Sequence, residues 1–213
     1  SKPSNRSWRV ALVRTHTWDQ ANQFAQRSIL DWAKQLSEVG DIEVIEVELP
    51  YEMEQAHKTH ATVYERSLAN YFEEEFKKSE LISPIMNEMI QRGLSITTDQ
   101  FHQSLKDQEN LARLMDEFLH GYDVMISLST AGEAPLLEEI ESPDPGLMWT
   151  MTHLPVISAP VFTSQNGLPF GAQLVARRYN DPLLFKFARY LGSMDLIPEG
   201  PNPSFNAGDG PFV

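Results

Sequence analysis

The chain has 213 residues, 41% of them hydrophobic, and a formal net charge of −13 from 17 Lys and Arg against 30 Asp and Glu. It has no cysteine, which excludes disulfide scaffolds, thiol nucleophiles, cysteine-based zinc sites and iron–sulfur clusters. Nucleic acids and anionic membranes require a basic surface, and no apolar run approaches the roughly 20 residues of a membrane helix, so neither partner is expected. The first residues lack the apolar core of a signal peptide, which predicts a cytoplasmic protein.

Residues 1–50 have the pattern of a β-α-β unit. Residues 8–13 and the Ile- and Val-rich residues 42–49 favour strands. The helix between them is predicted to begin at a capping box formed by Thr17 and Gln20, whose side chains would satisfy backbone donors reciprocally. Two strands joined by a helix usually lie parallel in one sheet.

Residues 51–121 are predicted to be helical. An apolar stripe at helical spacing runs from Met53 to Phe76. Ser83 is expected to cap a second helix, with Gly93 just past its end. A third helix is expected to begin at a capping box in residues 97–100.

Residues 122–192 are predicted to form a strand, a loop, a hairpin and a helix. Asn166 and Gly167 are a strong turn signal, so the apolar runs on either side should pair. Asp181 is expected to cap the helix that follows. In chain order we expect a strand at 122–128, a loop at 129–146, a short helix at 146–153, strands at 155–159 and 171–177, a helix at 181–191 and a tail at 193–213.

Five motifs from Tyr122 onward resemble the C-terminal half of an amidase signature enzyme. In chain order they are Y-D-V-M-I-S-L-S, E-A-P, W-T-M-T-H-L-P-V-I-S-A-P, N-G-L-P-F-G-A-Q-L-V-A-R and N-D-P-L-L-F-K-F-A-R-Y-L. Upstream, L-I-S-P-I-M-N-E-M-I-Q-R-G-L-S-I-T and W-R-V-A-L-V-R-T-H-T-W-D are also similar to the family. The resemblance covers essentially the whole chain, residues 1–213. It implies an α/β fold, a mixed sheet flanked by helices, that is the C-terminal portion of an amidase domain.

The resemblance implies hydrolysis of carboxamide C–N bonds by a Ser-Ser-Lys triad, with a small-molecule amide as substrate and no cofactor. A lysine accepts the proton of the nucleophilic serine, because a free hydroxyl attacks weakly, and a Gly/Ser-rich loop supplies the oxyanion hole. This sequence has no such loop and no serine in a G-x-S-x-G turn, so no catalytic residue can be placed in it. We therefore expect scaffold and substrate-pocket walls for a triad outside residues 1–213, and an inactive chain on its own.

Three residues are candidates for the substrate pocket. Trp149 and Thr152 stand where the family commonly has W-T-x-x-G, after the loop near its active-site mouth, and His153 replaces the usual glycine. Arg92 stands near a helix end where some relatives hold a substrate carboxylate, a task that suits a guanidinium. The alternatives are a core aromatic for Trp149 and, for Arg92, a cation that stabilises a helix C-terminus.

Two other residue sets suggest metal sites, but each lacks a required part. Glu54, His57 and His60 could present a carboxylate and two imidazoles near one helical face, but bundle sites need a second set on another helix. The acidic run in residues 138–144 lacks the alternating ligands and central glycine of an EF-hand. No metal site is predicted, and no phosphate-binding glycine motif is present.

A second functional hypothesis belongs to another class. The chain would be a truncated, non-catalytic amidase homologue that acts as a binding or interaction module. A sheet face or edge left uncovered favours association. This hypothesis predicts self-association, or pairing with a complementary chain.

Overall fold

The computed structural model describes residues 7–198. Most of the predicted tail, residues 199–213, lies outside the described residues. The strands are β1 (Trp8–Val13), β2 (Ile42–Val47), β3 (Val124–Leu128), β4 (Val156–Thr163) and β5 (Pro169–Val175). The α-helices are α1 (Gln23–Ser37), α2 (Ala56–Tyr71), α3 (Glu73–Phe76), α4 (Pro84–Ser95), α5 (Thr98–Phe118), α6 (Leu147–Met151) and α7 (Asp181–Ser193). Short 3₁₀ helices are η1 (Trp18–Gln20), η2 (Tyr51–Gln55), η3 (Ser79–Leu81) and η4 (Leu119–Gly121).

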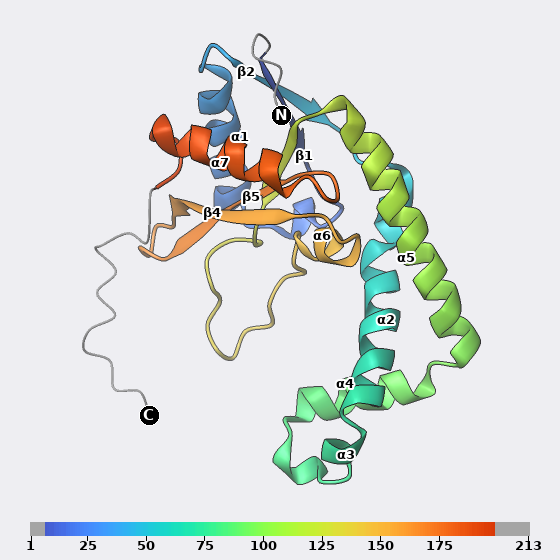
Figure 1. Ribbon diagram of the computed structural model, residues 1–213. Helices are drawn as coiled ribbons and strands as arrows, with labels where there is room; N and C mark the ends of the chain where they lie inside the picture. The colour runs from blue at the N-terminus through green and yellow to red at the C-terminus, as the bar shows by residue number, and fades with distance from the viewer. Residues whose placement is uncertain (1–6, 199–213) are drawn as a thin grey trace.

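The strands form one mixed sheet in the order β2-β1-β3-β5-β4 (Figure 1). β1 is parallel to β2 and to β3, whereas β5 is antiparallel to β3 and to β4. The predicted α/β fold with a mixed sheet is confirmed, and β4 and β5 form the predicted hairpin. The carboxyl ends of β1, β2 and β3 therefore lie at one edge of the sheet.

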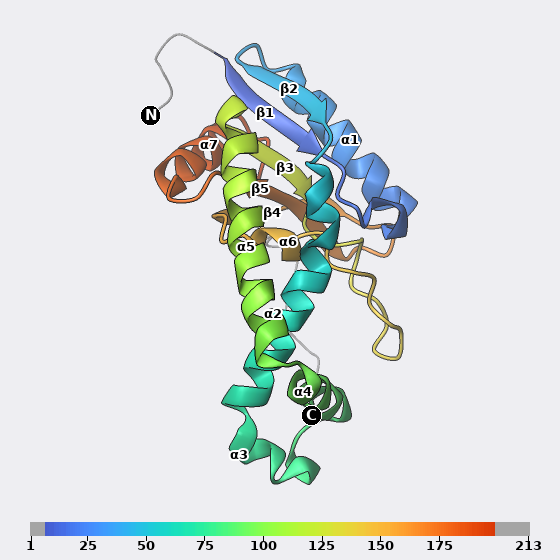
Figure 2. The same ribbon diagram turned by 90° about the vertical axis from the view of Figure 1, so that its right-hand side faces the viewer.

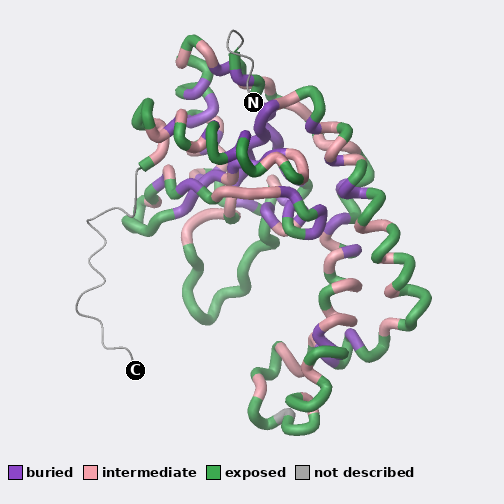
Figure 3. The backbone as a smooth tube through the Cα atoms, in the orientation of Figure 1, coloured by how far each residue is buried: buried purple, intermediate pink, exposed green. Residues whose placement is uncertain are grey.

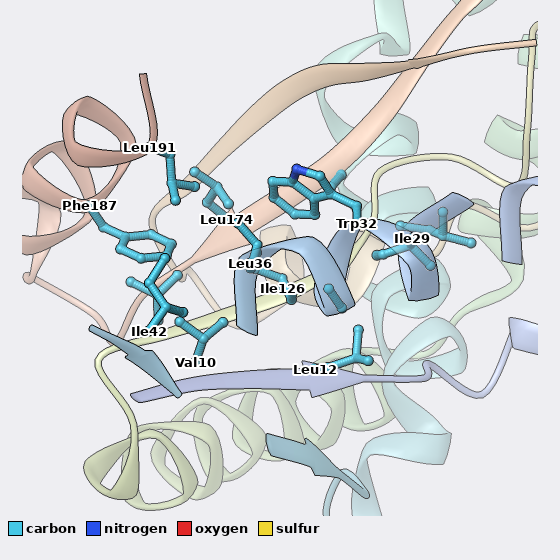
Figure 4. Packing of buried hydrophobic residues seen from close by; sticks show 14 of the residues in the cluster. Val10, Leu12, Ile29, Trp32, Leu36, Ile42, Ile126, Leu174, Phe187 and Leu191 are labelled. Carbon is cyan, nitrogen blue, oxygen red and sulfur yellow. The ribbon is translucent and has the colours of Figure 1, made fainter. Parts of the chain in front are cut away.

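Helices cover both faces of the sheet. On one face, α1 and α7 pack over Val10, Leu12 and Ile126, and Trp32 and Phe187 of these helices belong to the same buried cluster (Figure 4). On the other face, α5, α6 and the start of α2 pack over the alternate strand residues, which include Ala11, Val13, Met125 and Val175. All five residues of β3 are buried, as expected for a strand covered on both sides.

The far part of α2, with α3, α4 and the first turns of α5, forms a helical arm that extends from the sheet (Figure 2). Its apolar core is small: Leu68, Ala69 and Ile90 are its buried hydrophobic residues. Most of the arm's backbone is exposed or half-buried (Figure 3). The arm therefore depends on few contacts beyond those between its own helices.

The prediction that Gly93 lies just past the end of its helix is wrong. α4 continues to Ser95, and Gly93 is buried within it. A Cβ built on Gly93 would lie 2.0 Å from the carbonyl oxygen of Glu65 on α2. The glycine is there because the two helix backbones approach too closely for any side chain.

Two predicted N-caps are also wrong. Thr17 precedes only the short helix η1 and makes no capping bond; its buried hydroxyl lies 2.9 Å from that of Thr15. α1 is capped instead by Asn22, whose Oδ1 accepts the N–H of Phe24 at 2.7 Å. Asp181 is the first residue of α7 rather than its cap, so its carboxylate complements the positive end of the helix dipole.

The predicted caps of α4 and α5 are confirmed. Ser83 Oγ accepts the N–H of Met86 at 3.2 Å. Thr97 and Gln100 form the reciprocal capping box, with distances of 3.2 and 2.9 Å. Both caps are exposed, so local chemistry alone decides them.

Candidate functional site

The topology places a candidate site at the carboxyl ends of β1 and β3. The chain passes from β1 to β2 through α1 on one face of the sheet, and from β2 to β3 through α2–α5 on the other. Of the neighbouring strands β1 and β3, β1 is followed by a connection on one face of the sheet, and β3 is preceded by a connection on the other face. This pair of strands therefore marks a switch point in strand order. In open α/β sheets, ligands bind outside the carboxyl ends of the strands at such a point.

Two cavities flank this edge. One, of about 640 Å³, is lined by residues that follow β1 and β2, including Arg14, His16 and Glu54. The other, of about 990 Å³, lies between the loop that follows β3, the start of α1 at Asn22 and the β4–β5 turn with Phe170. The loops that follow the parallel strands therefore build the walls of both.

A histidine cluster, defined as His16, His57 and His60, lies at the same edge. His57 Nε2 donates to the carbonyl oxygen of Asp144 at 3.0 Å, and because a carbonyl only accepts, this nitrogen carries the proton. The His16 ring meets that of His57 edge-on, with centroids 4.5 Å apart. Nδ1 of His57 is buried without a hydrogen-bond partner among the described residues.

The surroundings of His16 and His60 favour neutral imidazoles. Burial lowers the pKa of His16, and the neighbouring His57 lowers it further, against an opposing effect of Glu54. Burial also lowers the pKa of His60, with His57 adding to the decrease and Asp144 opposing it. Both His16 and His60 resist gaining a proton because each is partly desolvated and faces the His57 ring.

Glu54, His57 and His60 do not converge on one point. His60 stacks on Tyr64, with ring centroids 5.3 Å apart, while His57 is directed to Asp144. Within residues 7–198, no group of three or more His, Asp or Glu side chains is arranged to hold a metal ion.

The loop between β3 and α6 is held by polar contacts at both ends. Near its start, the Glu133 carboxylate accepts hydrogen bonds from the Ser164 hydroxyl and from Nδ2 of Asn166 in the β4–β5 turn. Near its end, Asp144 binds His57 through its carbonyl and the N–H of Gly146 through its carboxylate, the latter at 2.6 Å. These contacts fix the loop over the larger cavity.

Trp149 and Thr152 are completely buried in and beside α6. Nε1 of Trp149 donates to Oγ of Ser127 on β3 at 3.2 Å, and Oγ1 of Thr152 donates to the carbonyl of Met148 at 2.7 Å. The Trp149 bond holds α6 against the sheet, next to the loop of the larger cavity, whereas the Thr152 bond stays within α6 and its end. Their predicted place in a substrate pocket stays a prediction.

His153 has a left-handed backbone conformation, with φ of 58°. Glycine enters this region freely, whereas other residues seldom do, although histidine is among the more tolerant. The residue after Thr152 thus keeps a conformation that suits a glycine even though a histidine occupies it.

Arg92 lies on α4, in the arm. Its Nε and Nη2 contact Oε1 of Glu65 at 2.8 and 2.6 Å, and this hydrogen bond raises the pKa of Arg92. α4 is at the far end of the arm from α6 (Figures 1 and 2). The structure therefore does not bring Arg92 together with Trp149 and Thr152.

The sequence patterns did not identify the pairing of His16 with His57 or the close contact between Gln173 and Gly146. These histidines are distant in sequence, so no local spacing joins them, although the position of His16 just after β1 was a usable signal. Gln173 packs so closely on Gly146 that a Cβ there would lie 2.5 Å from its Nε2. Its Oε1 is buried without a partner among the described residues.

Comparison with known proteins decides the family. The model of the amidase family matches residues 1–185. The chain belongs to the amidase family. A comparison with curated proteins found no match.

Solved amidase structures share the fold at low sequence identity. A protein described as an amidase superposes with a TM-score of 0.77 at 20% identity, over 91% of this chain and 48% of its own. A 6-aminohexanoate cyclic dimer hydrolase gives 0.68 at 18%, over 90% and 46%. A bacterial aryl acylamidase of the amidase signature family gives 0.65 at 16%, over 92% and 47%. The chain thus spans about half the length of these relatives.

In the described part of the chain, no helix combines the length and apolar character needed to cross a membrane.

Proposed function

We propose that this chain supplies scaffold and substrate-pocket walls for the hydrolysis of carboxamide C–N bonds. The observation that carries the proposal is the amidase family match over residues 1–185. The switch-point edge supports it, because this edge gathers the loops after β1, β2 and β3 beside two cavities. A small-molecule amide is the proposed substrate.

The proposed Ser-Ser-Lys triad lies outside residues 1–213. The sequence offers no Gly/Ser-rich nucleophile loop. At the candidate edge, Ser129 follows β3 directly, but its hydroxyl donates to the carbonyl of Gly171 at 2.8 Å. A serine held by a backbone acceptor is not activated, since a nucleophilic hydroxyl needs a base to take its proton.

We further propose that α6 and the preceding loop form one wall of the pocket. Trp149 and Thr152 would both act as positioning residues: Trp149 fixes α6 on β3 through Ser127, and Thr152 caps the end of α6 by donating to its carbonyls, while both side chains are fully buried. In this arrangement a change at Trp149 alters substrate binding by moving the wall, and a change at Thr152 does so by loosening the end of α6.

A serine-reactive fluorophosphonate probe tests the proposal without knowledge of the substrate. The probe is applied to the natural polypeptide that contains these residues, and the labelled peptide is identified by mass spectrometry. We expect one labelled serine, outside residues 1–213, together with ammonia release from a panel of carboxamides. Labelling of a serine within residues 1–213 would contradict the position of the triad. No labelling and no ammonia release would overturn amide hydrolysis in favour of a non-catalytic interaction module.

A further inference from the structure

A third cavity lies at the opposite edge of the sheet from the switch-point edge. We call it the amino-edge cavity, and its volume is about 390 Å³. Its walls come from α5, η4 and the segment between β5 and α7: Asp116, His120, Arg177, Arg178, Tyr179 and Asn180. β5 runs antiparallel to β3 and pairs Val175 with Met125, near the start of β3, so the segment that follows β5 lies at the amino end of β3. This cavity is therefore separate from the loops proposed as substrate-pocket walls.

The wall of the amino-edge cavity carries a net positive charge. Arg178 donates through Nε to Oδ2 of Asp116 at 2.7 Å and through Nη1 to Oε2 of Glu109 at 3.3 Å. The bond to Asp116 raises the pKa of Arg178, and the charge of Asp116 is balanced by this arginine. Arg177 adds a second guanidinium to the wall. In a chain whose net charge is −13, a positive wall is a local exception that favours an anion as ligand.

Four side chains on this wall keep hydrogen-bonding groups free for a ligand. Within residues 7–198, the side chains of Arg177, Tyr179 and Asn180 have no hydrogen bond or ion pair, and Asn180 does not cap α7. Nδ1 of His120 donates to the carbonyl oxygen of Asp116 at 2.7 Å, which leaves Nε2 free. A guanidinium presents paired N–H donors that match the two oxygens of a carboxylate, and an Asn side chain adds an NH₂ group.

Tyr179 offers an aromatic surface that the packing of the fold does not explain. Its side chain is 92% exposed, so the ring contributes little to the core. Its backbone has φ of 62°, a left-handed conformation that is an outlier for a bulky residue. Such outliers concentrate at ligand-binding positions. The exposed ring gives the apolar part of a ligand a face on which to stack.

We propose that the amino-edge cavity binds a small organic carboxylate. Arg177 and Asn180 hold the carboxylate group, and Tyr179 contacts the apolar part of the molecule. The volume of about 390 Å³ lies at the lower end of the range of about 300–1,000 Å³ for small-molecule sites, so it suits a small molecule. The proposal goes beyond amide hydrolysis and does not depend on it, since no catalytic group takes part.

A fluorine NMR titration of para-fluorobenzoate with the natural polypeptide that contains these residues tests the site. The polypeptide is first treated with the fluorophosphonate probe, so that a reactive serine is blocked. We expect line broadening that unlabelled benzoate reverses. R177Q should weaken the affinity at least about tenfold, because it removes a charge-assisted bidentate contact. Absence of binding, or equal affinity in the parent and R177Q, would overturn the proposal.

Three further variants identify which part of the wall acts. The matched control is R189Q, since Arg189 is exposed on α7 and does not line the cavity; its affinity should equal that of the parent. R177K keeps the charge but loses the planar fork, so its affinity should lie between those of the parent and R177Q. Y179G should weaken para-fluorobenzoate more than fluoroacetate. An equal effect of R189Q and R177Q would overturn the site, and an unchanged affinity in Y179G would overturn the contact with the ring.

Competition experiments identify the chemical class of the ligand. The neutral para-fluorobenzamide should not displace para-fluorobenzoate, because it lacks the charge that Arg177 recognises, and inorganic phosphate should displace it only weakly. Displacement by the amide as strong as by benzoate would overturn the role of charge. Displacement by phosphate stronger than by benzoate would overturn an organic carboxylate as the ligand.

Discussion

The sheet body and the helical arm are stabilised in different ways. The body has a core on each face of the sheet, with rows of fully buried residues from α1, α5, α6 and α7. The arm has three buried apolar residues, and Gly93 is buried at one close helix crossing, where it meets Glu65. Burial of apolar surface is the main favourable term in folding, so the body should unfold as one cooperative unit, whereas the arm should open locally at lower cost.

This difference bears on the candidate site. The loops of the switch-point edge rise from the body and are fixed by its strands, while Arg92 lies on the arm. Sites on rigid elements keep their geometry better than sites on mobile ones.

Phe187→Ala should destabilise the whole body by about 3–5 kcal/mol, the usual cost of removing a buried aromatic ring. Phe187 is fully buried, and its ring lies 5.0 Å from that of Trp8. Urea unfolding followed by tryptophan fluorescence measures the change. The control on the same helix is Phe185→Ala, at a side chain 56% exposed, which should stay within about 0.5 kcal/mol of the parent. Equal losses in the two variants would contradict a body core on α7.

Gly93→Ala should destabilise the arm by about 1–3 kcal/mol, because the new methyl group meets the backbone of Glu65 and forces α4 away from α2. Hydrogen exchange should show faster uptake in residues 62–95 and unchanged uptake in β1 and β3. In the matched control, Gly192→Ala, a Cβ meets nothing within 4 Å, so helix propensity should stabilise α7 by up to about 1 kcal/mol. Faster uptake throughout the sheet of Gly93→Ala would show that arm and body are a single unit.

Stability should fall as the pH decreases below the ordinary histidine pKa of about 6.5. The pKa values of His16 and His60 are lowered in the folded chain, so the unfolded chain binds more protons in this range and gains stability from them. Their contribution is fully present above the unfolded pKa and is lost as the pH falls through the lower, folded values. Unfolding free energies measured between about pH 7.5 and about pH 5.5 should decrease more in the parent than in His16→Gln/His60→Gln. Parallel pH profiles would exclude the histidine cluster as the cause.

Arg92→Gln should have the smallest effect on stability, because the guanidinium is 54% exposed, although the Glu65 side chain is only 14% exposed, and an ion pair with a solvated partner contributes little. The rate at which a protease cleaves the arm should match that of the parent.

The same variant of the natural polypeptide tests the predicted contact of Arg92 with a substrate carboxylate. A raised KM for amides that carry a carboxylate, with an unchanged KM for neutral amides, would support that contact. Unchanged KM values for both classes of amide would contradict that contact and would leave Arg92 only its ion pair with Glu65.

Sequence patterns predicted the helices and strands that local residues determine. They failed where the structure depends on contacts between residues distant in sequence. β1 and β3 are readable because both faces of each strand are buried, and the hairpin because Gly167 takes a left-handed conformation, with φ of 80°. Gly93 was misread because a helix stop and a helix crossing both favour glycine.

The candidate site was less predictable than the fold. The resemblance identified α6 through Trp149 and Thr152, but their burial depends on how α6 packs on β3. The pairing of His16 with His57 arises only when the ends of β1 and α2 meet, and no sequence spacing reports that.

Ammonia release from simple aliphatic and aryl carboxamides by the purified chain 1–213 tests most directly whether the chemistry lies elsewhere. The amidase family match covers residues 1–185, and our proposal assigns this chain scaffold and pocket walls because its sequence has no Gly/Ser-rich nucleophile loop. We expect no turnover by residues 1–213 alone. Turnover that a serine-directed reagent abolishes would contradict this and would place the nucleophile within the chain.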